Sequence, residues 1–174
     1  KVGRTNTLGP QAAEQGINKA VFREGVVIQM TWTGAPTIYY GDEAGVCGFT
    51  DPDNRRTYPW GHEDQVLLAF HKDIIRLRRE NEELRSGSLK MLESDYNFIS
   101  YGRFNRKGQC AVLINNNNHP ITKEIHVWEI GTPKTGKMKV ILQSRDDGYC
   151  MEGAEYEIKA GKILIELPQT CLLY

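Results

Sequence analysis

Acidic, basic and aromatic side chains crowd residues 42–60, and the clearest pair among them is Asp51 and Arg55. The hexapeptide DPDNRR follows a Gly-Phe-Thr turn, and Pro52 stiffens its backbone, so a compact turn should hold the carboxylate near the guanidinium. Such a pair suits sugar hydroxyls, because a carboxylate accepts hydrogen bonds and a guanidinium donates them in fixed directions. A surface salt bridge that contributes little to stability explains the same spacing equally well.

Trp60, two residues after Tyr58, offers a flat apolar face and an N–H donor beside these charges. An indole placed in this way can stack on a sugar ring. A tryptophan at the start of a helix can equally serve as a hydrophobic staple, so the spacing leaves both roles open.

Asp42 and Glu43 directly follow an apolar run, a position where a catalytic pair or metal ligands can lie. Adjacent side chains on an extended backbone point to opposite sides, however, so they rarely share one reacting atom. We therefore expect a structural role, in which one carboxylate accepts hydrogen bonds from backbone donors of the loop and the other pairs with a base.

The elements around this segment are predicted from hydrophobic periodicity and from Gly and Pro breaks. Apolar residues over 17–32 predict a helix, which a Gly and a Pro then end. The uncharged run TIYY, residues 37–40, predicts a strand buried on both faces, so Tyr39 and Tyr40 should be core residues. An apolar stripe over residues 63–84 predicts a second helix. This order of elements is typical of a parallel α/β architecture.

After residue 86 the pattern changes to short β-branched or alternating runs, separated by turn signals such as NRKG, GTPKTGK and AGK. Runs of this kind predict an antiparallel β-sandwich. The fold class is therefore α+β, with one domain over residues 1–85 and a second over residues 86–174. The scattered aromatic residues of the second domain are expected in its core: Tyr96, Tyr101, Tyr149 and Trp128.

Composition argues against several classes of partner. Lys plus Arg and Asp plus Glu number 22 each in 174 residues, so no net charge recruits nucleic acid or an anionic membrane. No apolar run approaches the roughly 18 residues that span a bilayer. The four cysteines and four histidines show no metal-ligand spacing. We therefore expect no zinc site and no cofactor, and free thiols that fit a reducing compartment such as the cytoplasm.

Three stretches in the right order resemble the carboxy-terminal part of α-amylase-type glycoside hydrolases: GAPTIYYGDEAG…DPDNRRTYPW, IIRLRRENEELRSGSLKML and GQCAVLINN. The similarity is strongest to the neopullulanase, cyclomaltodextrinase and maltogenic amylase group and covers residues 20–115. It implies that residues 37–40 form the eighth strand of a (β/α)₈ barrel and that the helices on either side are the seventh and eighth barrel helices. Residues 86–174 would then be the family's C-terminal β-sandwich.

In such enzymes the acid and the arginine of a D-x-x-x-R pattern after strand eight contact glucose units of the substrate. The resemblance assigns this role to Asp51 and Arg55, and to Asp53, Arg56 and Trp60 of the same loop. The family's nucleophile, general acid and third aspartate come from strands four, five and seven, which the resemblance places upstream of Lys1. It therefore implies no catalytic residue in this chain and no hydrolysis by the chain alone; calcium is an option only in the parent protein.

The chain begins at Lys1 with a polar stretch and reads like the middle of a longer polypeptide. We expect a piece of an enzyme that cleaves α-1,4 and, as a further option, α-1,6 glucosidic bonds with retention, whose partner is an α-glucan oligosaccharide. Apolar barrel segments without their neighbours should make the fragment self-associate. The alternative function is a stand-alone carbohydrate-binding or protein-interaction module.

Overall fold

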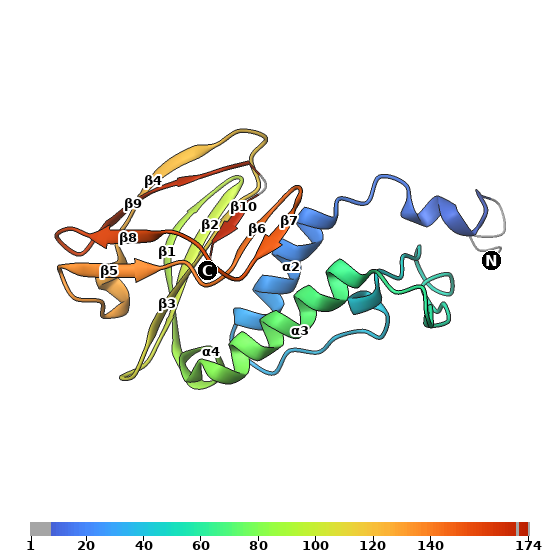
Figure 1. The fold of residues 1–174 in the computed structure, drawn as a ribbon, viewed down its shortest axis with the longest axis horizontal. Coiled ribbons are helices and arrows are strands. Elements are labelled where there is room, and N and C mark those ends of the chain that lie inside the picture. Colours follow the sequence, from blue (N-terminus) through green and yellow to red (C-terminus); the bar gives the residue numbers. More distant parts are fainter. Residues whose placement is uncertain (1–7, 170, 174) are drawn as a thin grey trace. The chain divides into compact units, whose positions relative to one another are not determined.

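The computed structural model of the chain describes residues 8–169 and 171–173. Helices α2–α4 lie in the first half of the chain and the strands in the second (Figure 1). The helical elements are η1 (Pro10–Glu14), α2 (Lys19–Thr31), η2 (Asp42–Ala44), α3 (Gln65–Glu80), α4 (Glu82–Ser86) and η3 (Val127–Ile130), where η denotes a 3-10 helix. The strands are β1 (Ser88–Asp95), β2 (Phe98–Phe104), β3 (Gln109–Asn115), β4 (Ile121–Ile125), β5 (Gly136–Lys139), β6 (Gln143–Arg145), β7 (Gly148–Cys150), β8 (Glu155–Ile158), β9 (Ile163–Leu167) and β10 (Cys171–Leu173). Across the described ranges, every helix is too short or too polar to cross a membrane.

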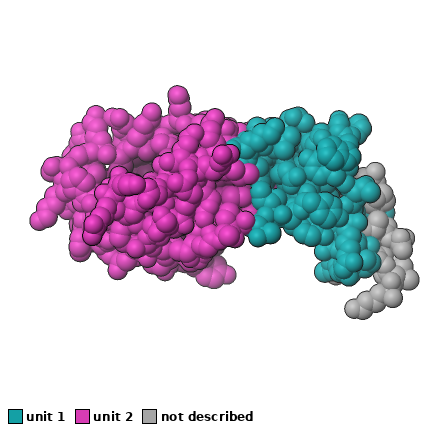
Figure 2. Space-filling model, turned by 90° about the horizontal axis from the view of Figure 1, so that it is seen from below, with its two compact units in different colours: residues 1–18, 37–72 teal, residues 19–36, 73–174 magenta. Residues whose placement is uncertain are grey.

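Two compact units make up the chain, and Figure 2 shows them in different colours. Unit 1 comprises residues 1–18 and 37–72, and unit 2 comprises residues 19–36 and 73–174. Helix α3 is continuous across this division. The domain boundary at residue 86 remains a prediction. It was inferred from the change in sequence pattern and from the resemblance to the family, whereas the two compact units are defined by contacts within the chain.

Helix α2 of unit 2 confirms the helix predicted over residues 17–32. Its last turn contains no basic residue, and other parts of unit 2 cap its carboxy-terminal carbonyls. Arg78 Nη1 donates to Met30 O at 2.6 Å, and Nη1 of the buried Arg103 donates to Thr31 O at 2.5 Å. Carbonyls at a helix end have no partner within the helix, so these guanidiniums supply the donors that the local sequence does not.

The second predicted helix, over residues 63–84, starts later than expected and is interrupted. Asp64 Oδ1 accepts a hydrogen bond from the backbone N–H of Leu67 at 3.0 Å, so Asp64 caps the first turn of α3. At Asn81 the backbone is extended, with φ −103° and ψ 108°, and the side-chain amide donates to Leu77 O at 2.8 Å. Asn side chains favour such local hydrogen bonds over continued helix, which separates α3 from the short α4.

Within the described residues, the strands of unit 2 form one six-stranded antiparallel sheet, in the order β1-β2-β3-β10-β6-β7, and two smaller sheets, β4–β9 and β5–β8. Strand β9 buries Ile163, Ile165 and Leu167 and exposes Leu164, the alternation expected of a strand with one buried face. A hydrophobic cluster joins side chains of β2, β3, β4, β8 and β9. The prediction of an antiparallel β domain is confirmed.

Residues 37–40 form no strand, contrary to the prediction: residues 37–39 have no regular secondary structure, and Tyr40 begins a turn. A strand needs a neighbour with which to form a ladder, and every strand in the described part of the chain lies between Ser88 and Leu173 and pairs there. The side chains of Tyr39 and Tyr40 are 49% and 47% exposed, so their assignment to a core is wrong for this chain.

The aromatic residues of the β domain divide between core and surface. Tyr101 is fully buried, as predicted, and its hydroxyl lies 2.6 Å from Thr31 Oγ1. Trp128 and Tyr96 are exposed, contrary to expectation. Tyr96 lies in the tight turn between β1 and β2. Scattered aromatic residues alone therefore do not identify the core.

Candidate functional site

In unit 1 the chain turns sharply at Gly41, directly after residues 37–40. Gly41 has φ +92°, and a Cβ added to it would lie 2.8 Å from Val46 Cγ2, so the turn requires glycine. The backbone N–H of Gly41 donates to Glu43 Oε2 at 3.0 Å. Glu43 thus accepts a backbone donor of the loop, as expected for one of the two adjacent carboxylates.

The other carboxylate, Asp42, lies near the buried base His71 of α3. Burial raises the pKa of Asp42, and the electrostatic influence of His71 acts in the opposite direction. His71 Nδ1 lies 2.8 Å from Leu67 O, and because a carbonyl oxygen only accepts, Nδ1 carries the proton in this contact. Asp42 and Glu43 therefore have separate partners, which fits a structural role better than a catalytic pair.

The turn that carries DPDNRR brings Asp51 and Arg55 together, as the spacing predicts. Arg55 Nε lies 2.7 Å from Asp51 Oδ1, and the two side chains are 68% and 61% exposed, respectively. The backbone N–H of Asp53 donates to Thr50 O at 2.9 Å, and that of Arg55 donates to Pro52 O at 3.1 Å. The backbone of the turn thus fixes an ion pair that remains open to solvent.

Close backbone packing supports this turn from one side. A Cβ added to Gly48 would lie 2.7 Å from Asn54 Cα and 3.0 Å from Asp53 O. Real Cβ atoms do not approach backbone atoms so closely, so only glycine lets the two ends of the turn meet here. The geometry of the Asp51–Arg55 pair therefore depends on Gly48.

Aromatic rings surround the charged turn in contacting pairs. The ring centroids of Tyr39 and Tyr40 lie 4.8 Å apart, and those of Tyr58 and Trp60 lie 4.5 Å apart. Trp60 is 79% exposed and precedes α3 by several residues, which argues against a hydrophobic staple. The Tyr40 hydroxyl donates to Arg56 O at 2.8 Å and so connects residues 37–40 to the charged loop.

Burial and nearby charged groups shift the pKa values of Tyr40 and Tyr58 in unit 1. Burial raises the pKa of Tyr40, Tyr39 raises it further, and Arg55 acts against both effects. Burial and the carboxylates of Glu43 and Glu63 raise the pKa of Tyr58. Both hydroxyls therefore stay protonated at neutral pH and can donate hydrogen bonds.

Asp53 and Arg56 are half-buried in the same loop as Asp51 and Arg55. The loop thus contains all the residues predicted to contact substrate, with Trp60 at its end, while the role of each in binding stays a prediction. In the described part of the chain, no group of three or more His, Cys, Asp or Glu side chains is placed to hold a metal ion.

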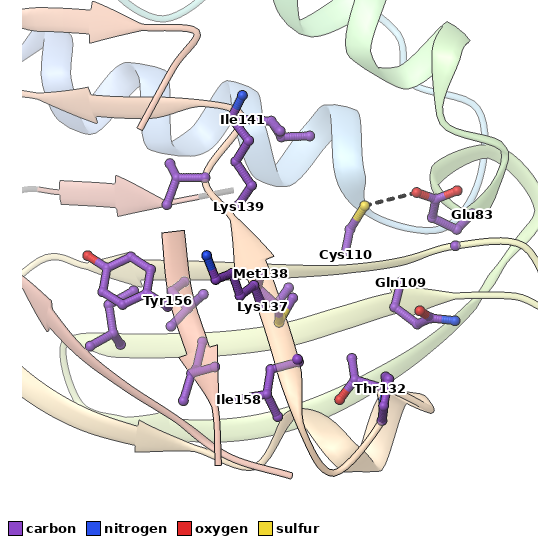
Figure 3. A pocket seen from close by; sticks show the side chains of 18 of the residues that line it. Glu83, Gln109, Cys110, Thr132, Lys137, Met138, Lys139, Ile141, Tyr156 and Ile158 are labelled. Carbon is purple, nitrogen blue, oxygen red and sulfur yellow. Dashed lines mark hydrogen bonds between the residues drawn. The ribbon is translucent and has the colours of Figure 1, made fainter. Parts of the chain in front are cut away.

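Sequence reasoning found no site in the β domain, yet unit 2 contains a cavity of about 340 Å³ (Figure 3). Glu83, Cys110 and Thr132 line it and come from α4, β3 and the segment after η3. Side chains so far apart in the sequence form no motif. The one sequence signal for this cavity was Glu83, an acidic residue in the amphipathic helix predicted over residues 63–84.

Comparison with known proteins finds similarity to amylopullulanases, neopullulanases and cyclomaltodextrinases. No family model matches the chain. The chain is 35% identical over 144 residues to an amylopullulanase of Thermoanaerobacter thermohydrosulfuricus, covering 81% of this chain and 10% of that protein. It is also 35% identical over 156 residues to neopullulanase 2 of Thermoactinomyces vulgaris, covering 87% of this chain and 25% of that protein. The chain thus spans a tenth to a quarter of these relatives' length.

The fold is similar to that of a solved α-amylase from Geobacillus thermoleovorans, whose structure was determined in complex with acarbose. The TM-score is 0.73 at 18% sequence identity, and the match covers 99% of this chain and 36% of that one. At this identity the match shows a shared fold, and it covers both the helical and the β-rich halves of the chain.

Proposed function

From the confirmed resemblance of this chain to the carboxy-terminal part of α-amylase-type glycoside hydrolases, we propose that it is a piece of an α-glucan hydrolase and forms one wall of the substrate cleft. The observation that carries this proposal is the exposed Asp51–Arg55 ion pair, which a turn holds at 2.7 Å. The resemblance implies that this segment contacts glucose units. The relatives named amylopullulanase and neopullulanase support the substrate class.

In this function the loop binds and orients sugar and does not react with it. The free oxygen of Asp51 accepts hydrogen bonds from sugar hydroxyls, and the remaining N–H groups of Arg55 donate to them. Trp60 offers an exposed apolar face for a pyranose ring, and Asp53 and Arg56 complete the polar wall. Retaining cleavage requires a nucleophile and a general acid, which we assign to strands outside this chain.

We further propose that residues 37–40 form the eighth strand of a barrel, with α2 and α3 as its last two helices. The uncharged, β-branched and aromatic composition of residues 37–40 is that of a buried strand, and neighbouring strands would cover Tyr39 and Tyr40, which are exposed in this chain. A parallel strand gains its partners only from neighbouring strands of the same barrel. The β-rich residues 86–174 would be the supporting C-terminal domain.

Hydrolysis assays test whether catalysis lies elsewhere. The purified 174-residue chain should release no reducing sugar from maltodextrin, cyclodextrin or pullulan, while a longer protein that includes the preceding barrel should do so. Turnover by the pure 174-residue chain would overturn the assignment of the catalytic carboxylates to another part of the protein.

The exposed rings of Tyr39, Tyr40 and Trp60 favour one alternative, a stand-alone sugar-binding module. Calorimetry with maltooligosaccharides separates the two functions. One wall of a cleft should bind too weakly to measure, because it buries little of the ligand, whereas a complete binding module should give a micromolar Kd.

The same exposed side chains lead us to propose that the isolated chain self-associates. Val21, Trp32, Tyr39, Tyr40 and Val66 are each more than a third exposed, and apolar surface of this kind usually finds a partner. Sedimentation should show species larger than the monomer at micromolar concentration. A single monomeric species would contradict this.

A further inference from the structure

The cavity of unit 2 differs in chemistry from the charged loop of unit 1. Much of its lining is apolar and belongs to the hydrophobic cluster of the β domain, including Leu113, Ile158, Ile163 and Ile165. Its volume of about 340 Å³ lies at the low end for ligand pockets. Because a water molecule occupies about 30 Å³, the cavity has room for a molecule of roughly ten non-hydrogen atoms.

One side of this cavity carries a buried carboxylate. Glu83 of α4 is 7% exposed, and its Oε1 accepts a hydrogen bond from Cys110 Sγ at 3.0 Å. A Cβ added to Gly108 would lie 2.8 Å from Glu83 Oε2, so glycine leaves the space that the carboxylate fills. A thiol is a weak donor, and a buried carboxylate is stabilised far better by a hydroxyl or a cation.

A second polar group lines the cavity without a protein partner. Thr132 Oγ1 is buried, and no hydrogen-bond partner for it exists among the described residues. In Figure 3, Thr132 lies at a different edge of the cavity from Glu83, and the ring of Tyr156 lies across from Glu83. Native structures rarely bury a hydroxyl without a partner, so Thr132 points to a ligand atom in this space.

These observations constrain the chemistry of a ligand. A purely apolar molecule would leave Glu83 and Thr132 without strong partners, which is costly in a buried site. A sugar that carries hydroxyls on every side would lose hydrogen bonds against Leu113 and Ile158. We propose that this cavity binds a small molecule with a compact apolar body and a hydrogen-bond-donating head group, a hydroxyl or an ammonium, which Glu83 accepts.

Lys137 and Lys139 also line the cavity, but they do not change the preference for a donor. Lys137 is 64% exposed and its Nζ donates to Glu155 Oε2 at 2.9 Å, and Lys139 is also exposed. Solvent and salt screen such exposed charges strongly, whereas Glu83 acts from within the protein. Ligands with an anionic head group should therefore bind least well.

Three probes that share one body test the head group directly: cyclohexylmethylamine, cyclohexylmethanol and cyclohexanecarboxylate. Titration of the 174-residue chain, followed by NMR, should show saturable binding of the amine and the alcohol, and at least tenfold weaker binding of the carboxylate. Glucose, which has no apolar body, should bind no better than the carboxylate. Equal affinity for all three probes, or tighter binding of glucose, would overturn the proposal.

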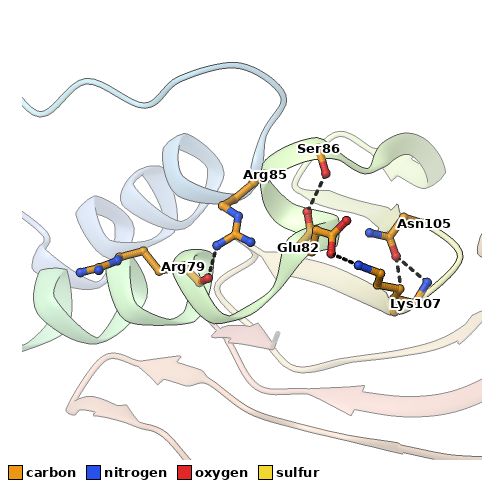
Figure 4. Close-up of polar contacts among 7 residues, drawn as sticks. Arg79, Glu82, Arg85, Ser86, Asn105 and Lys107 are labelled. Atoms are coloured by element: carbon orange, nitrogen blue, oxygen red, sulfur yellow. Dashed lines mark hydrogen bonds and ion pairs between the residues drawn. The ribbon is translucent and has the colours of Figure 1, made fainter.

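Substitution of Glu83, the proposed hydrogen-bond acceptor, tests whether the probes bind in this cavity. Glu83→Gln should weaken binding of the amine about tenfold or more. Glu82→Gln is its matched control, because Glu82 neighbours Glu83 on α4 but is exposed, with its Oε2 2.6 Å from Lys107 Nζ (Figure 4). An equal effect of both variants, or an effect of neither, would contradict a role for Glu83.

Thr132→Val separates ligand binding from folding. Because Thr132 Oγ1 has no partner among the described residues, replacing the hydroxyl by a methyl group should leave the stability of the free protein unchanged or raise it. The same change should weaken the alcohol several-fold. A loss of stability without a loss of affinity would mean that the hydroxyl serves the fold and not a ligand.

Thiol alkylation gives a readout that needs no variant. The amine should slow alkylation of Cys110, which lines the cavity, and leave Cys150, which is exposed, unaffected. Cys150 thus serves as the internal control. Equal protection of both thiols, or of neither, would show that the probe does not occupy the cavity. Loss of function in the Asp51–Arg55 loop would leave each of these results unchanged.

Discussion

Arg55 Nε lies 2.7 Å from the Oδ1 atom of Asp51, four residues earlier, and both side chains remain mostly exposed. Exposed ion pairs of this kind contribute at most about 1 kcal/mol to stability. The backbone hydrogen bonds of the turn, rather than the ion pair, fix the position of the two groups. The fold therefore depends little on the ion pair itself.

Asp51→Asn and Arg55→Lys should each lower the kcat/KM of the longer enzyme on maltooligosaccharides by roughly 10- to 100-fold. The first change removes the negative charge of the acceptor, and the second removes the planar fork of N–H donors. Activity on a minimal aryl glucoside should fall much less, because that substrate does not reach a distant glucose subsite. Steady-state kinetics on both substrates provide the measurement.

The control for this prediction is Glu157→Gln, which breaks the similarly exposed Lys159–Glu157 pair in the β domain. It should change neither substrate's kinetics. Equal losses on the long and the minimal substrate in the Asp51 and Arg55 variants would mean that the pair supports the loop instead of contacting sugar.

Gly48→Ala should disturb the charged turn without removing any of its functional groups. The added methyl group would meet Asn54 Cα at 2.7 Å, and a backbone atom cannot move aside as a flexible side chain does. The displaced turn should reduce activity on oligosaccharides about as much as Arg55→Lys.

Gly25→Ala serves as the control for the glycine substitution. Gly25 lies in the middle of α2, and a Cβ added there would meet nothing within 4 Å. This variant should gain up to about 1 kcal/mol in stability through helix propensity. Wild-type kinetics of Gly48→Ala would show that the turn tolerates displacement.

Arg78→Ala should destabilise unit 2 by about 2–3 kcal/mol or more, measured by urea unfolding. The Arg78 guanidinium donates to the carbonyls of Met30, Gly34 and Leu84, which would lose their donors. The neighbouring Arg79 has an exposed side chain, so Arg79→Ala should change stability by no more than about 0.5 kcal/mol. Similar midpoints for both variants would rule out the capping role of Arg78.

Glu24 should make stability depend on pH. It is 5% exposed on α2, and burial, with a further contribution from Asp146, raises its pKa from 4.5 to about 7. Between these values the unfolded chain is ionised at this position while the folded chain holds the proton, so the free energy of unfolding falls as pH rises. The loss is about 1.4 kcal/mol per pH unit and at most about 3 kcal/mol in total.

Glu24→Gln removes this titration. The stability of the variant relative to the parent chain should increase from pH 4.5 to pH 7 and stay constant above it, as measured by urea unfolding across the pH range. A difference that does not change with pH would mean that the pKa of Glu24 is the same in the folded and the unfolded chain.

The sequence alone determined the features that depend on near neighbours. The apolar spacing of residues 19–31 was sufficient for α2, and a proline-stiffened turn was sufficient to bring Asp51 and Arg55 together. The short β-branched and alternating runs after residue 86 likewise predicted antiparallel strands. In each case the groups that interact lie within a few residues of one another, so spacing fixes the geometry.

Only the tertiary structure decided the features that depend on distant partners. Residues 37–40 have the composition of a strand, but in the described structure they lack the neighbour that a ladder requires. The carbonyls at the end of α2 are capped by Arg78 and Arg103, far along the chain. The cavity that joins Glu83 to Thr132 arises where separate elements meet, and contacts between elements leave no periodic trace in the sequence.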